Sequence, residues 1–69
     1  MSEVARILRE RIEAAQHGVE QAERAGHEHE VHLHSARLLE LIDRAREHGI
    51  DVSEWVGQGA LAAAAENVR

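Results

Sequence analysis

The sequence predicts an all-α protein, with an antiparallel helical hairpin over about residues 2–25 and 27–48 and a short C-terminal helical segment within 51–68. Apolar residues recur at helical spacing in both halves of the hairpin, glycines stand where those patterns stop, and helix formers dominate, with a single aromatic residue, Trp55. Sixty-nine residues suffice for one small domain, at a size where extra stabilisation is usually needed. Because cysteine is absent, we expect self-association or a partner to complete the bundle.

The two hairpin helices are predicted from matching apolar stripes. The first, with Ser2 as N-cap, comprises Ala5, Leu8, Ile12, Ala15, Val19 and Ala22. The second comprises Val31, His34, Leu38, Leu41, Ala45 and His48. Gly26 and Gly49 end the stripes, as expected for C-caps in the left-handed region.

The stripes also predict a register, since facing residues in an antiparallel pair have numbers with a constant sum. The predicted pairs are Val19 with His34, Ala15 with Leu38, Ile12 with Leu41, and Leu8 with Ala45. One check opposes this register, because it brings Glu23 near Glu28 and Arg11 near Arg44, which are pairs of like charge.

A helix start is predicted after Gly49. Asp51 is suited to the N-cap with Glu54 as its reciprocal partner, and Ile50 and Trp55 have the spacing of a hydrophobic staple. Gly57 and Gly59 are expected to break or bend this segment, and the alanine-rich residues 59–68 to form a weakly anchored last helix.

Several apolar residues lie outside both stripes and need burial elsewhere: Val4, Ile7, Leu33, Leu39 and Ile42. One interpretation is a monomer whose tail, with Trp55, Val56 and Leu61, folds back over them. The interpretation we favour is that two hairpins pair as a homodimer, or that the surface docks on a larger protein assembly. The contact residues predicted on that basis are Ile7, Leu33, Leu39, Ile42 and Trp55.

The stretch "HEHEVHLH" contains four of the six histidines. Pairs on one helix face make His27, Glu30, His34, His29 and His32 candidate ligands for zinc, nickel or copper. Each pair supplies two ligands where a site needs three or four, and His17 is predicted to point outward, so a second chain would have to complete the site. The alternative is that His29 and His32 are ordinary surface residues, while His34 and His48 fill positions in the stripe.

A pH response is an intermediate interpretation of the same histidines. Protonation of all six would move the net charge from −5 to +1 as the pH falls through about 6.5. A charged His34 in a packed stripe would be unfavourable. Assembly would then be sensitive to acid.

Charge and composition limit the classes of partner. A net charge of −5 argues against nucleic acid, and no apolar run or leader favours a membrane, so a cytoplasmic location, or a virion, is expected. The basic residues are all arginine, alanine is abundant, and lysine, phenylalanine and tyrosine are absent. This composition is typical of a GC-rich genome.

The sequence does not predict an enzyme. Ser35 follows His34 directly, and neighbours on a helix project in different directions, so no nucleophile and base are aligned. Gly57-Gln58-Gly59 lacks the strand and lysine of a phosphate loop, and no HExxH motif is present. We therefore expect a non-enzymatic interaction protein, such as a bacterial adaptor or an accessory component of a phage particle. The alternative is a histidine-based metal-binding or pH-responsive protein.

Overall fold

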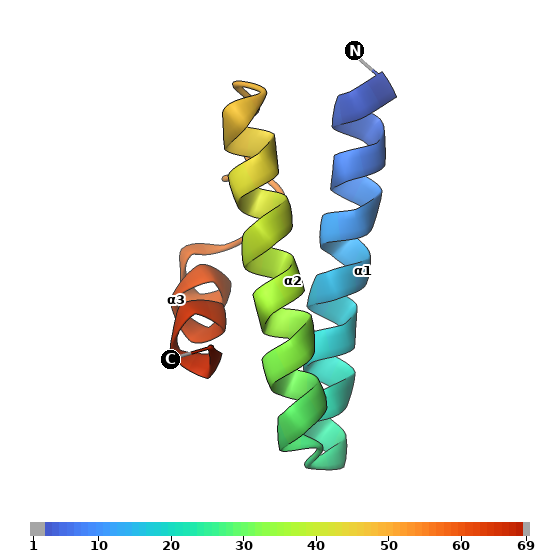
Figure 1. The fold of residues 1–69 in the computed structure, drawn as a ribbon, viewed down its shortest axis with the longest axis vertical. Coiled ribbons are helices and arrows are strands. Elements are labelled where there is room, and N and C mark those ends of the chain that lie inside the picture. The colour runs from blue at the N-terminus through green and yellow to red at the C-terminus, as the bar shows by residue number, and fades with distance from the viewer. Residues whose placement is uncertain (1–2, 69) are drawn as a thin grey trace.

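The all-α prediction is confirmed. The computed structural model describes the backbone of residues 3–68 and the side chains of residues 3–57 and 62–68. Helices α1 (Glu3–Ala25) and α2 (Glu28–Glu47) run antiparallel, and α3 (Gln58–Asn67) lies on the other side of α2 (Figure 1). The predicted N-cap, Ser2, lies outside the described residues.

Both long helices end at the predicted glycines. Gly26 and Gly49 have φ values of 72° and 70°, in the left-handed region that a side chain would disfavour. The amide of His27 donates to the carbonyl of Ala22 at 2.9 Å, and the amide of Ile50 donates to that of Ala45 at 2.9 Å. Each helix therefore ends in a Schellman motif, in which the glycine turns the chain and the next amide satisfies a terminal carbonyl.

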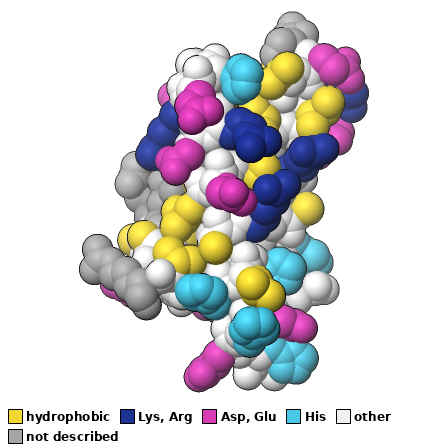
Figure 2. Space-filling view, in the orientation of Figure 1, with side chains coloured by type: hydrophobic (Ala, Val, Ile, Leu, Met, Phe, Trp, Pro, Cys, Tyr) yellow, Lys and Arg dark blue, Asp and Glu magenta, His cyan; other side chains and the backbone are white. Residues whose placement is uncertain are grey.

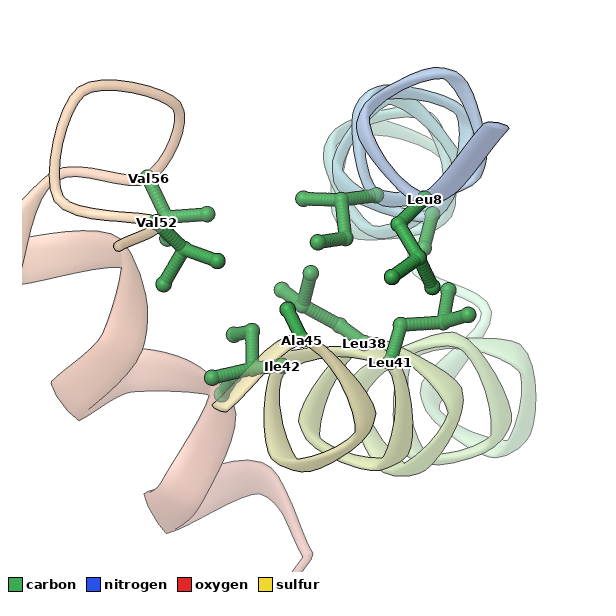
Figure 3. Close-up of a cluster of buried hydrophobic side chains, with 10 residues drawn as sticks. Leu8, Leu38, Leu41, Ile42, Ala45, Val52 and Val56 are labelled. Carbon is green, nitrogen blue, oxygen red and sulfur yellow. The ribbon is translucent and has the colours of Figure 1, made fainter. Parts of the chain in front are cut away.

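The interface between α1 and α2 follows the predicted stripes. Ile12, Leu38 and Leu41 are among its most deeply buried members, in a cluster with Leu8 and Ala45 (Figure 3). The centre of the predicted stripes therefore forms the core, as helical periodicity requires. His48 is an exception, because it is exposed at the C-cap of α2 and fills no position in the core.

The segment after Gly49 differs from the prediction. Asp51 accepts a hydrogen bond from the Ser53 amide at 2.9 Å, but the chain makes only one turn, closed by the Val56 amide on the Val52 carbonyl at 3.0 Å. Gly57 then adopts an extended conformation, with ψ of 155°, and α3 begins at Gln58. Asp51 therefore caps an isolated turn rather than a helix. The Ser53 amide, and then its hydroxyl, hold the pKa of Asp51 below its usual value of 3.8.

This turn covers one side of the hairpin. Val52 and Val56 are buried in the same cluster as Ile42 and Ala45, and Figure 3 shows them opposite the hairpin side chains. Ile42, predicted to contact a partner, is only 1% exposed and therefore belongs to the core of this chain. The tail thus folds back over part of the apolar surface, as the monomeric interpretation expected.

Polar contacts fix the end of α3 on α2. The side-chain amide of Asn67 donates to the hydroxyl of Ser35 at 3.2 Å, and Ser35 is fully buried. The Asn67 carbonyl lies 3.0 Å from Nδ1 of His32. Because a carbonyl can only accept, this contact is a hydrogen bond in the tautomer that carries its proton on Nδ1 of His32. Among the described residues α3 packs on α2 and not on α1.

Candidate interaction surface

The side of the hairpin opposite the tail is uncovered, and we call it the open face. On α1 its residues recur at spacings of three and four, and on α2 they follow the same rule beside the core stripe. The open face comprises Val4, Ile7, Arg11, Ala14 and Gly18 of α1, and Leu33, His34, Arg37, Leu41, Arg44 and His48 of α2. Its middle is hollowed by about 320 Å³, and this hollow has an apolar floor that includes Ala15 and Leu41.

The open face holds every large hydrophobic side chain that is exposed among the described residues. Val4 is 44% exposed, Ile7 36% and Leu33 52%. Figure 2 shows one face of the molecule, on which arginines lie near the middle, interspersed with acidic side chains, and hydrophobic side chains lie around them. Single exposed hydrophobics are common on protein surfaces, and here three of them lie on the same uncovered face.

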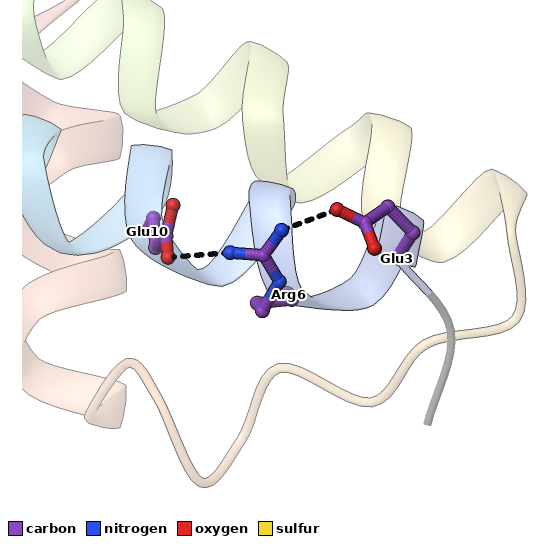
Figure 4. Close-up of polar contacts among 3 residues, drawn as sticks. All are labelled: Glu3, Arg6 and Glu10. Atoms are coloured by element: carbon purple, nitrogen blue, oxygen red, sulfur yellow. Dashed lines mark hydrogen bonds and ion pairs between the residues drawn. The ribbon is translucent and has the colours of Figure 1, made fainter.

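Two of the three arginines on the open face have no acidic partner. Within the described part of the chain, neither Arg11 nor Arg44 forms an ion pair, while Arg37 pairs with Glu40 at 3.3 Å. Arg6, by contrast, lies between Glu3 and Glu10 on the outer side of α1 and pairs with both (Figure 4). The open face thus concentrates uncompensated positive charge on an acidic protein.

Beside the hollow, α1 and α2 approach each other closely at Gly18 and His34. The ring of His34 lies so near α1 that a Cβ placed on Gly18 would be 2.8 Å from Nδ1 and 2.9 Å from Cγ. Gly18 is inside α1, where glycine is unfavourable, and the missing side chain makes room for the imidazole. His34 is therefore half-buried in a notch of α1, one residue away from its predicted partner, Val19.

The predicted contact residues divide into two groups. Ile7 and Leu33 lie on the open face. Leu39 and Trp55 are half-buried and pack against the core, and Ile42 is inside it. A partner could reach Ile42 only if the tail moved away, whereas Leu39 and Trp55 keep part of their surface exposed.

The histidines of the candidate metal site do not converge. Nδ1 of His27 lies 3.1 Å from a carboxylate oxygen of Glu30, which brings two of the candidates together. His34 faces Gly18, His32 faces Asn67, and His29 is exposed. No three acidic or histidine side chains in the described part of the chain are placed to hold one ion. His27 and Glu30 would need ligands from elsewhere.

The arginines of the open face were not predicted as site residues. Their signal is present in the sequence, because the predicted register places Arg11 near Arg44, a pair of like charges that opposes this register. Like charges at facing positions are unfavourable within one chain. They are compatible with a surface whose charge is neutralised by something else.

No protein-family model, curated protein or solved structure matches this chain. None of the described helices combines the length and the apolar character needed to cross a bilayer. The function is therefore inferred from the residues of the chain itself.

Proposed function

We propose that this protein is a non-enzymatic interaction protein that binds other polypeptide chains through the open face. The observation that supports this most directly is the one-sided cover of the hairpin. The tail buries Val52 and Val56 against one side, while Val4, Ile7 and Leu33 remain exposed on the other. A third layer on the open face would bury these side chains and add apolar core to a small domain.

The adaptor and particle-accessory roles both fit such a surface. In either role the folded hairpin provides a rigid face, and the partner supplies the missing layer of the bundle. The partner is a second copy of the chain or a subunit of a larger assembly.

Site-specific photo-crosslinking tests this function. A photoreactive amino acid such as benzoylphenylalanine replaces Leu33 on the open face, and in a control it replaces Asp43, whose side chain is 76% exposed on the far side of α2. We expect a protein adduct from position 33, in cells that produce the protein, and none above background from position 43. The mass of the adduct distinguishes a second copy from another protein. If position 33 gives only the background seen at position 43, the open face is not a binding surface.

A further inference from the structure

Building on the proposed function, we infer that the partner of the open face is an acidic amphipathic helix from another protein, lying in the groove between α1 and α2. Three features support this partner: the shape of the groove, the placement of its charges and the poor fit of a second copy.

The shape of the open face suits a helix. Two packed antiparallel helices leave a straight groove, and the 20 residues of α2, the shorter helix, limit it to about 30 Å in length. Its floor in the middle is apolar, with Ala14, Ala15 and Leu41. An amphipathic helix binds such a groove by laying its apolar stripe along the floor, with anchors at spacings of three and four.

The arginines of the open face indicate which side chains the bound helix should carry. Arg11 is on α1, and Arg37 and Arg44 are on α2, so positive charge lies on both sides of the groove. A bound helix with its apolar stripe on the floor would present its flanking residues to these guanidinium groups. Glutamate or aspartate on both flanks would pair with Arg11 and Arg44, which form no ion pair among the described residues, and arginine favours such bidentate pairing.

A second copy of the chain does not supply these carboxylates at the same face. In a two-fold dimer through the open face, the face would meet itself, arginines included. The acidic side chains at its edges are already paired, since Glu10 binds Arg6, Glu30 contacts His27 and Glu40 binds Arg37. The charge of the open face is thus complementary to a different chain.

The negative charge of the rest of the molecule argues against nucleic acid or a membrane as the partner. The whole chain carries −5, and these three arginines contribute +3, so the remainder carries −8. Nucleic acid and an anionic membrane are extended surfaces that would also meet this negative remainder. A single helix confined to the groove contacts the arginines and, of this negative remainder, meets only the acidic side chains at the edges of the open face.

The test uses two synthetic helical peptides as long as α1, measured against the full chain by fluorescence anisotropy. Both carry a leucine stripe, and they differ only in having glutamate or lysine on both flanks of the stripe. We expect the glutamate peptide to bind at least about tenfold more tightly than the lysine peptide, with an affinity that falls as salt increases. The double variant Arg11→Glu, Arg44→Glu should reverse the preference.

A matched control is Arg24→Glu, because Arg24 also lacks an ion pair among the described residues but lies outside the open face. This variant should bind the glutamate peptide as the wild type does. Circular dichroism checks that each variant is folded. If the double variant is unfolded, the salt dependence and the peptide preference of the wild type still decide the question.

Three results would overturn the inference. Equal binding of both peptides would mean that charge does not select the partner. Failure to bind the glutamate peptide, together with binding to vesicles of equal phosphatidylglycerol and phosphatidylcholine, would assign the face to a membrane. A dimer in sedimentation that persists in the double variant, without binding of the glutamate peptide, would assign it to a second copy. Crosslinking from position 33 with no preference for the acidic peptide would leave the proposed function in place and remove this inference alone.

Discussion

Replacing Gly18 with alanine tests whether the imidazole of His34 determines how closely the hairpin closes. Alanine inside a helix is normally more stable than glycine by about 1 kcal/mol. At this position the added Cβ would lie 2.8 Å from Nδ1, 2.9 Å from Cγ and 3.0 Å from Cε1 of His34. These distances are shorter than van der Waals contact, so either the ring or the helix has to move.

The expected magnitude follows from these two opposing effects. Overpacking of a closely fitted site typically costs about 1–3 kcal/mol, which outweighs the gain in helix propensity. We expect Gly18→Ala to destabilise the protein by about 1 kcal/mol, a fall in melting temperature of about 4–8 °C for a domain of this size. With His34→Ala already present, the same change should stabilise by about 1 kcal/mol, which gives a coupling energy of about 2 kcal/mol.

Urea denaturation followed by circular dichroism measures the four members of this cycle. Gly26→Ala is the control, because its φ of 72° makes alanine unfavourable although no side-chain atom would meet the new Cβ within 4 Å. It should cost about 1–2 kcal/mol whether or not His34 is present. If Gly18→Ala stabilises the wild type as much as it stabilises the His34→Ala variant, the ring moves aside without cost and does not determine how closely the hairpin closes.

Further expectations follow from the rest of the structure. In urea denaturation, Ile42→Ala should destabilise the protein by about 2–5 kcal/mol, because Ile42 is 1% exposed. Leu33→Ala changes a side chain that is 52% exposed and should alter the stability by less than about 0.5 kcal/mol. Equal effects of the two substitutions would contradict the assigned burial. Asn67→Ala removes the hydrogen bond to Ser35, so it should lower the free energy of unfolding by about 1 kcal/mol and speed hydrogen exchange in α3 more than in α1. Unchanged exchange in α3 would show that this bond does not hold α3 on α2. Because the Ser53 donors lower the pKa of Asp51, its carboxylate stabilises the fold above its unfolded value near 3.8, and that contribution is lost as the pH falls through the lower folded value. The advantage in melting temperature of the wild type over Asp51→Ala should therefore shrink below about pH 4, and a constant difference in acid would exclude this role for Asp51.

Much of the hairpin could be predicted from the sequence because its determinants are local. The spacing of Leu8, Ile12 and Ala15 sets one apolar stripe, that of Leu38, Leu41 and Ala45 sets the other, and glycine at positions 26 and 49 adopts the left-handed conformation. The local signal was less reliable after Gly49. Asp51 does cap a turn, but whether that turn continues depended on the extended backbone of Gly57.

The residues available for binding were decided by tertiary structure alone. Ile42 and Leu33 are both apolar and both lie outside the predicted stripe, so the stripe by itself does not say which of the two is covered. Val52 and Val56 cover the first and leave the second exposed. The bond between Asn67 and Ser35, 32 residues apart, helps fix α3 on the tail side of α2. The sequence by itself determined the helices and their turns, because these depend on neighbours within one or two turns of backbone. The face left open was determined by contacts between distant parts of the chain, which helical periodicity does not encode.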